Sequence, residues 1–407
     1  MKKPSLSSRM QEAFNPNSPY RLLLLTTIFT GLAFGIQKGM LDNFLVEVVG
    51  MNQMDRGVAE FFRELPGVLL IFILAVFYTL SAETLYKSGI VIMLVGLGMY
   101  TVLPPDKVLM TLTVFLFSLG DHIQFGVRSS LVLAYSKEGR GGAALGVQYS
   151  INEIGMLVGY LIIVLAFSLF AAAAPYRIFF AVAAVLLGGG VITSLHIHGK
   201  NATDENKRRF RLQKKYHKYY MLEMFYGARK QVFMTFGPYV LILFYGANAA
   251  AISLLFAVSA VACSLLSPLV GRIIDRIGYK TVMVADTLIL VIVCFFYGFA
   301  HHFLPMKAAY LVCCANYVLD AVISMASMAS NVYVQDLAET AEEVPVTIST
   351  GVSINHLISI FIALFGGWIW KTLGIELLFI LSAVLGLCNS AYAASIKTST
   401  VRKEKSA

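Results

Sequence analysis

Long apolar stretches separated by short polar ones run along the whole chain. A helix that crosses a membrane needs about 20 mostly apolar residues, and twelve stretches of this kind can be read from the sequence. Turn-forming residues such as Pro104-Pro105-Asp106 and Gly246-Ala247-Asn248 separate them. The pattern predicts an all-α membrane protein with twelve transmembrane helices, over residues 20–49, 57–80, 88–103, 108–135, 144–170, 177–196, 221–247, 250–270, 281–300, 306–334, 346–370 and 375–395.

The composition excludes most soluble classes of protein. Of the 407 residues, 58% are hydrophobic and only 14% are charged, whereas a typical soluble domain has about 25% charged residues. The sequence contains no GxxxxGK[ST], HExxH or GxSxG motif, so we expect no catalytic residues, no cofactor and no metal. The 5 cysteines lie in apolar stretches without a CxxC pair, and we expect them to be packing residues.

The positive charge indicates an orientation in the membrane. The chain has 32 Lys and Arg against 23 Asp and Glu, a net charge of +9. If the N-terminus lies inside, 22 basic residues fall in inner loops and tails, and 5 in outer loops, namely Arg56, Lys107, Arg177, Lys307 and Lys371. Inner loops are the basic ones in membrane proteins. We therefore predict cytoplasmic termini in a multi-pass protein of the bacterial inner (plasma) membrane, with no nucleic-acid partner.

A basic stretch in the middle divides the predicted helices into six and six. The expected parts are an N-terminal tail (1–19), a six-helix bundle (20–197), a basic cytoplasmic linker (198–220), a second bundle (221–396) and a C-terminal tail (397–407). Matching short segments recur in the two halves, namely Phe34-Gly35-Ile36-Gln37-Lys38 with Tyr226-Gly227-Ala228-Arg229-Lys230, Leu119-Gly120-Asp121 with Val318-Leu319-Asp320, and Ser150-Ile151-Asn152-Glu153 with Ser353-Ile354-Asn355-His356. The repeat predicts two pseudo-symmetric bundles with a cavity between them.

The segment between the eighth and ninth predicted helices resembles a known family. It reads Gly271-Arg272-Ile273-Ile274-Asp275-Arg276-Ile277-Gly278-Tyr279-Lys280, which is similar to the GxxxDRxGxK loop of the major facilitator superfamily. The resemblance implies that family's fold and a cavity lined by its first, fourth, seventh and tenth helices, and therefore by Lys38, Asp121, Lys230 and Asp320. It also implies a gate motif formed by Gly271, Asp275, Arg276, Gly278 and Lys280.

Charged residues inside the predicted helices are the first candidates for function, because a charge in the bilayer costs at least about 2.5–3.5 kcal/mol. Lys38 and Lys230 occupy matching positions, and we hypothesise that they bind an anionic or zwitterionic solute. Lys38 could instead pair with Asp42, one helical turn further on. Arg63 could likewise line the cavity, or pair within its helix with Glu60 and Glu64. The other expected solute-site residues are Phe34, Asp121, Arg128, Tyr149, Asn152, Tyr226 and Asn355.

Arg229 and Asp286 are interpreted differently. Arg229 lies about 100° around the helix from Lys230, which favours a structural role. Asp286 is expected to be peripheral, because its helix lies outside the cavity in the family.

Four titratable residues are candidates for proton coupling. Glu153 and His356 occupy matching positions in the two halves, and Asp42 and Asp320 also lie within apolar helices. Carboxyl and imidazole groups inside membrane helices commonly form proton relays. We therefore expect transport to be coupled to protons through one or more of Asp42, Glu153, Asp320 and His356.

Together these features predict a secondary transporter that moves a small organic solute by alternating access. Two alternatives stay open: a proton-driven multidrug or metabolite efflux antiporter, and a non-transporting receptor or scaffold on the same fold. In the fifth predicted helix, Gly155 and Gly159 form a GxxxG pattern typical of close helix packing. The family's antiporter proline is absent there, since Met156 follows Gly155. The expected partners are the solute, the proton and the lipid bilayer, and we expect a monomer.

Overall fold

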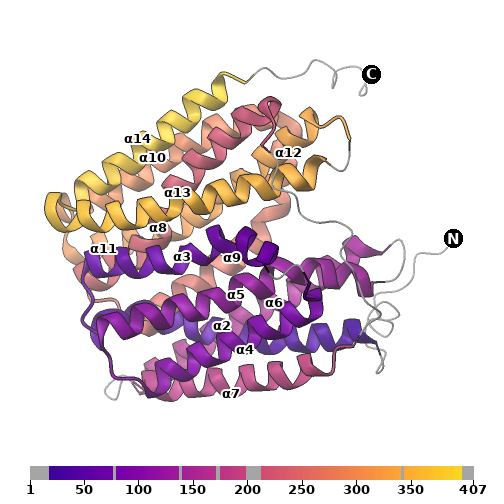
Figure 1. Cartoon of the computed structure of the whole chain (residues 1–407). Helices are drawn as coiled ribbons and strands as arrows, with labels where there is room; N and C mark the ends of the chain where they lie inside the picture. The colour runs from indigo at the N-terminus through magenta and orange to yellow at the C-terminus, as the bar shows by residue number, and fades with distance from the viewer. Residues whose placement is uncertain are drawn as a thin grey trace. The chain divides into compact units, whose positions relative to one another are not determined.

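The structure is a computed structural model that describes residues 18–76, 79–136, 140–170, 175–198, 212–340 and 343–396. Within these ranges the chain is helical almost throughout and contains no strand (Figure 1). Nearly all of the predicted N-terminal tail, the linker residues 199–211 and the predicted C-terminal tail lie outside the described residues. The prediction of an all-helical protein is confirmed.

Every predicted apolar stretch overlaps a helix. The first half forms α2 (Pro19–Glu47), α3 (Gln53–Val76), α4 (Ala82–Val102), α5 (Lys107–Tyr135), α6 (Gly141–Leu169) and α7 (Tyr176–Leu195). The second half forms the short 3-10 helix η1 (Lys214–Tyr216), α8 (His217–Tyr245), α9 (Ala249–Ile277), α10 (Tyr279–Phe303), α11 (Met306–Ser324), η2 (Met325–Ser327), α12 (Met328–Leu337), α13 (Glu343–Leu373) and α14 (Ile375–Ala394).

Ten helical stretches among the described residues are long and apolar enough to cross a membrane, with Met306–Leu337 counted as one. The helices α3 and α8 are not among these ten. Both carry several charged residues within their apolar sequence, for example Glu60 and Arg63 in α3, and Arg229 and Lys230 in α8. The described chain is therefore a multi-pass membrane protein in which these two helices concentrate the charge.

The chain divides into two compact units. Unit 1 comprises Met1–Val49, Leu69–Lys207 and Asn248–Phe256, and unit 2 comprises Gly50–Val68, Arg208–Ala247 and Ala257–Ala407. Two helices are thus shared: the first part of α3 belongs to unit 2, and the first part of α9 belongs to unit 1. In α3 the change of unit follows directly after Pro66-Gly67.

Unit 1 is held together by close packing of α2 against α6. In α2, a Cβ atom on Gly35 would overlap the backbone of Met156. In α6, a Cβ atom on Gly159 would lie 2.7 Å from the backbone nitrogen of Ile36. Small residues let helix backbones approach closely in membranes, so the GxxxG pattern of Gly155 and Gly159 does pack two helices together, as predicted. The helices α2 and α4 also pack on α7, and α4 packs on α5.

Unit 2 repeats this packing order. The helix α8 packs on α13 and α14, and α10 packs on α11 and α14. A Cβ atom on Gly227 of α8 would lie 2.8 Å from Cγ of Asn355 on α13. The glycine of the repeated Gly-x-x-Lys segment therefore contacts the corresponding helix in each unit, α6 in unit 1 and α13 in unit 2. This shared pairing of helices is the structural basis of the sequence repeat.

The predicted gate motif is mostly helical rather than a loop. The expected helix ends at residue 270, but α9 continues to Ile277, so Gly271, Asp275 and Arg276 lie in its last two turns. Only Gly278 leaves the helix, with a left-handed φ of +85° that glycine adopts easily. Lys280 follows in α10, and its Nζ atom donates to the backbone oxygen of Ile396 at 2.9 Å.

The end of the linker contacts the start of α13. Lys215 Nζ and the Tyr216 hydroxyl both donate to Glu343 Oε2, at 2.7 and 2.8 Å. The hydrogen bond to Glu343 raises the pKa of Lys215. These contacts join the described end of the basic linker to unit 2.

Candidate functional site

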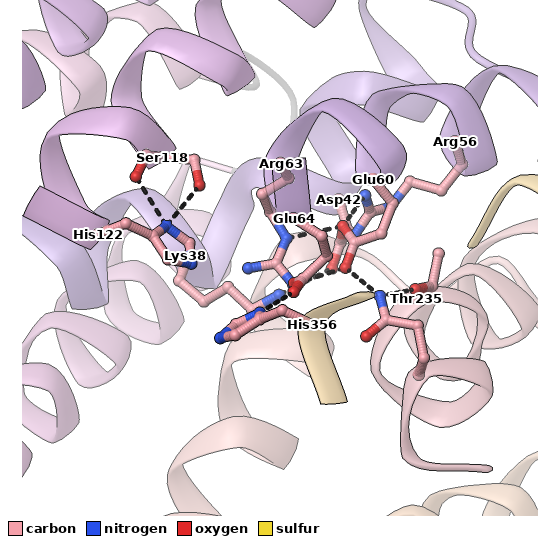
Figure 2. Close-up of polar contacts among 11 residues, drawn as sticks. Lys38, Asp42, Arg56, Glu60, Arg63, Glu64, Ser118, His122, Thr235 and His356 are labelled. Carbon is pink, nitrogen blue, oxygen red and sulfur yellow. Dashed lines mark hydrogen bonds and ion pairs between the residues drawn. The ribbon is translucent and has the colours of Figure 1, made fainter. Parts of the chain in front are cut away.

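The most extensive group of buried charges lies on the first part of α3, within unit 2 (Figure 2). Glu60 is fully buried and stands at its centre. Arg56 Nη1 donates to Glu60 Oε2 at 2.6 Å, and Arg63 donates to both oxygens of Glu60 at 2.8 and 2.6 Å. Arg63 also pairs with Glu64. The predicted pairing of Arg63 with Glu60 and Glu64 is therefore observed.

Two residues from other helices of unit 2 complete this group. His356 Nδ1 of α13 lies 2.7 Å from Glu64 Oε2, and Gln231 Nε2 of α8 donates to Glu60 Oε1 at 2.8 Å. We call Arg56, Glu60, Arg63, Glu64, Gln231 and His356 the α3 charge cluster. It holds two titratable groups, Glu64 and His356, in direct contact, an arrangement that can exchange a proton.

A second group lies on α8 and its neighbours, also in unit 2. Arg229 is 2% exposed, and its Nη2 atom donates to Asp286 Oδ2 at 3.2 Å. Asp286, expected outside the solute cavity, is only 8% exposed and pairs with Arg229 inside the unit. Asp320 is buried within electrostatic range of both. Arg229 is therefore fixed in the interior, as its predicted structural role requires.

Lys230 differs from Arg229 in its surroundings. It is partly exposed, and within the described ranges it makes no hydrogen bond or ion pair. Its ammonium group lies within electrostatic range of the buried carboxyl groups of Glu223 and Asp320. Lys230 is therefore available to a ligand in a way that Arg229 is not.

A small cavity opens beside this second group. It has a volume of about 20 Å³, room for one water molecule or small ion. Glu223, Asp286, Ser330 and Asn389 contribute polar atoms to its lining, and Glu223 accepts a hydrogen bond from the Ser330 hydroxyl at 2.7 Å. Within the described part of the chain, the buried Oδ1 atom of Asn389 has no hydrogen-bond partner.

In unit 1, Lys38 lies beside Asp42. The Lys38 ammonium is 3.8 Å from the Asp42 carboxylate, which is completely buried, while the Lys38 side chain is 23% exposed. The same ammonium stands 5.3 Å from the centre of the Phe256 ring, on the part of α9 that belongs to unit 1. The alternative pairing of Lys38 with Asp42 is thus present, and Lys38 keeps an accessible face.

A polar chain joins α5 to α6 in unit 1. Arg128 Nη1 donates to Asn152 Oδ1 at 3.1 Å, and Asn152 Nδ2 donates to Glu153 Oε1 at 3.4 Å. Also on α5, about two turns before Arg128, Asp121 Oδ1 accepts from Gln124 Nε2 at 3.0 Å. Three predicted site residues, Arg128, Asn152 and Glu153, therefore lie together.

The remaining predicted residues are more dispersed. Phe34 packs against Phe117, with ring centres 6.0 Å apart. The Tyr226 hydroxyl donates to the backbone oxygen of Ser324 at 3.0 Å. Tyr149 is 62% exposed on the surface of unit 1. Asn355 lies beside Glu223 and packs on Gly227.

Sequence reasoning missed four residues of these groups: Arg56, Glu223, Gln231 and Asp286. Arg56 was expected in an outer loop, but it lies in α3 and is 1% exposed, because the helix begins at Gln53 rather than residue 57. The spacing of Arg56, Glu60 and Glu64 at four-residue intervals indicates one helix face and could have revealed it. Gln231 contacts Glu60 across 171 residues of sequence, a distance that no local pattern spans.

Comparisons with known proteins identify the fold. The family model of the Major Facilitator Superfamily matches residues 219–406. A mutant of the nucleoside transporter NupG superposes with a TM-score of 0.73 at 16% identity, covering 93% of this chain and 99% of that chain. A POT family transporter in complex with 5-aminolevulinic acid superposes with a TM-score of 0.69 at 13% identity, covering 91% and 94%. No curated protein matches the sequence.

Proposed function

We propose that the chain is a member of the major facilitator superfamily, whose family model matches residues 219–406, and that it is a proton-coupled secondary transporter of a small anionic or zwitterionic organic solute. Members of this superfamily that are built from two repeated halves work by alternating access around a site between the halves. We further propose cytoplasmic termini, a bacterial inner membrane and a monomer, with the two halves divided at the basic linker (198–220).

The availability of Lys230 is the observation that carries the proposed solute class. Among the charged residues of α8, Arg229 is fixed by Asp286, whereas Lys230 is partly exposed and unpaired within the described residues. An unpaired ammonium in a membrane helix is costly unless something compensates its charge. Glu223 and Asp320 lie within electrostatic range of Lys230 but form no ion pair with it among the described residues, so a carboxylate or phosphate on the solute could bind the ammonium directly. The matching residue Lys38 is also partly exposed, which supports the same assignment in unit 1.

The similar structures are described with organic solutes. NupG is described as a nucleoside transporter, and the POT family transporter is described in complex with 5-aminolevulinic acid, a compound with both an amino group and a carboxyl group. Similarity at 13–16% identity shows the fold alone. We therefore choose the solute class from Lys38 and Lys230 rather than from these proteins.

The proposed proton coupling is supported by the contacts of Glu64, His356 and Glu153. The hydrogen bond between His356 and Glu64 places two titratable groups on different helices in direct contact. Glu153 ends the polar chain that begins at Arg128. The buried carboxyl group of Asp42 lies next to Lys38. The buried carboxyl group of Asp320 lies within electrostatic range of Lys230. Proton uptake by any of these carboxyl groups would weaken its attraction to the neighbouring cation.

A transport assay with purified protein in proteoliposomes tests the proposal. Labelled nucleosides, amino acids and organic acids are offered with and without a pH gradient. We expect at least one anionic or zwitterionic compound to accumulate, and a protonophore to abolish that accumulation. We expect Lys230→Gln to reduce uptake about tenfold to a hundredfold, because one hydrogen bond to a charged group is worth about 1.5–3 kcal/mol. Lys307→Gln, at an exposed position at the start of α11, is the control and should transport normally.

Three results would contradict parts of this proposal. Absence of flux for every compound, together with ligand binding, would favour a receptor or scaffold. Unchanged uptake by Lys230→Gln would remove the proposed site. Accumulation only when the pH gradient is reversed would favour the alternative of a proton-driven efflux antiporter.

A further inference from the structure

Two histidines at the end of α10 meet a glutamate at the start of α14, and none of the three belongs to the charge clusters described above. His301 Nε2 lies 3.5 Å from Glu376 Oε1, and His302 Nε2 lies 2.9 Å from the same oxygen. We propose that His301, His302 and Glu376 form a binding site for a divalent transition metal ion of the zinc class. The proposal is independent of the transported solute.

The distances suit a metal ion. The three candidate ligand atoms all lie within 4.8 Å of one another. Zinc binds imidazole nitrogen and carboxylate oxygen at about 2.0–2.2 Å in tetrahedral geometry, so neighbouring ligand atoms are about 3.4 Å apart. The nitrogen–oxygen distances of 2.9 and 3.5 Å bracket this value. An ion can therefore enter with small side-chain adjustments.

The donor set selects the class of ion. Two imidazole nitrogens and one carboxylate oxygen are a recurrent set for zinc, which then keeps a fourth position for water. Magnesium and calcium prefer oxygen ligands. The His302 side chain is 54% exposed and that of Glu376 is 32% exposed, whereas that of His301 is 16% exposed. The site is therefore open on one side, where an ion and its water can enter.

Neighbouring residues hold the three ligands in place. The ring of His301 packs on Phe244, with centres 5.1 Å apart, and lies 4.0 Å from the ring of His302. A Cβ atom on Gly374 would lie 2.7 Å from Glu376 Oε2, so the glycine leaves space for the carboxylate to fold back. Gly374 also has a left-handed φ of +99°, which glycine tolerates. The ligands come from two helices of unit 2, so a bound ion would link α10 to α14.

The test measures metal binding by the whole protein. The protein is purified in detergent with a tag that contains no histidine, and bound metal is removed with a chelator. It is then titrated with Zn²⁺ and, separately, with Co²⁺. The visible absorption spectrum of bound Co²⁺ reports its coordination geometry. We expect one bound Zn²⁺ per chain, a tetrahedral Co²⁺ spectrum, and a higher melting temperature with Zn²⁺ than with Mg²⁺. His301→Ala, His302→Ala and Glu376→Gln should each weaken Zn²⁺ binding by at least about tenfold, since losing even an outer partner of a metal ligand costs that much.

Two controls keep the result interpretable. His196→Ala removes an exposed histidine directly after α7, whose Nδ1 atom hydrogen-bonds to the backbone oxygen of Ile192, and should bind Zn²⁺ as the unchanged protein does. Circular dichroism and gel filtration of each variant establish that it is folded. Zn²⁺ binding that is absent, or that is equal in the folded His301→Ala/His302→Ala variant, would overturn the proposal and leave an ordinary hydrogen bond between His302 and Glu376.

Discussion

The exposure of individual cations separates those that hold the fold from those that can meet a solute. Arg56 and Arg229 are 1% and 2% exposed and are paired with Glu60 and Asp286. The side chains of Lys38 and Arg63 are 23% and 24% exposed, although both are also paired. A charge that is fully buried needs a partner to offset its lost hydration. We therefore assign structural roles to Arg56 and Arg229.

The pair of Arg229 and Asp286 gives a direct stability prediction. We expect Arg229→Met alone to destabilise the protein by about 3–5 kcal/mol, because it leaves the Asp286 carboxylate buried without its partner. The double variant Arg229→Met/Asp286→Leu should recover most of this loss, since apolar replacements of a buried pair are often neutral. Denaturation of the purified protein, followed by circular dichroism, measures both. A double variant as unstable as the sum of the single ones would contradict the pairing.

The contact between His356 and Glu64 gives a prediction about coupling. Glutamine can donate the same hydrogen bond but cannot take up a proton near neutral pH. We expect His356→Gln to lower proton-driven accumulation by roughly tenfold, equal to about 1.4 kcal/mol of lost coupling, while solute exchange without a pH gradient continues. Two assays in proteoliposomes measure the difference: uptake driven by a pH gradient, and counterflow exchange of the solute without one. His198→Gln is the control, and equal losses in both assays would indicate a structural role instead.

Sequence could predict only those contacts of the site that stay within one helix. Lys38 with Asp42, and Glu60 with Arg63, are spaced four and three residues apart, so helix geometry alone brings them together. Asp286, the partner of Arg229, lies 57 residues away, and His356, which contacts Glu64 in addition to Arg63, lies 292 residues away. Such contacts depend on which helix faces pack, which one sequence does not contain. The repeat did indicate that Asn152 and Asn355 would occupy related positions.

At the scale of helices, the apolar pattern locates each helix well but places its ends poorly. The apolar count stops near residue 270 because Arg272 and Asp275 follow, yet α9 continues to Ile277. A charged residue need not end a helix, and arginine is a good helix former, so α9 ends only before Gly278, which has a positive φ. In the same way, α3 begins before the apolar stretch does, and this places Arg56 inside the helix. The apolar stretch marks the part of a helix that lies inside the membrane, whereas the helix itself can extend beyond that stretch at either end.

The packing of α2 on α6 gives a prediction with a control in the same helix. We expect Gly159→Ala to destabilise unit 1 by about 1–3 kcal/mol, because the added methyl group would overlap the backbone at Ile36. Gly146→Ala, also in α6, meets nothing within 4 Å. It should be neutral or stabilising by up to about 1 kcal/mol, since alanine favours the helix. Thermal unfolding in detergent measures both, and equal effects would contradict close packing at Gly159.

At the scale of the whole molecule, the bias of basic residues predicts which face lies in the cytoplasm. The turn before α4 and the turn before α5 should lie on opposite sides of the membrane, because α4 crosses it once. Leu80 and Pro105 are exposed in these turns and cap neither helix. They are therefore suitable positions for single cysteines in a variant that lacks the native ones.

With the N-terminus in the cytoplasm, Pro105→Cys should react with a membrane-impermeant maleimide in intact cells, and Leu80→Cys should react only after the membrane is opened. The physical reason is that basic loops are retained on the cytoplasmic side during insertion. Mass-shift labelling on a gel measures the reaction of each variant. The reverse pattern would show that the basic linker faces outward, and it would also exchange the directions of import and export inferred from any transport assay.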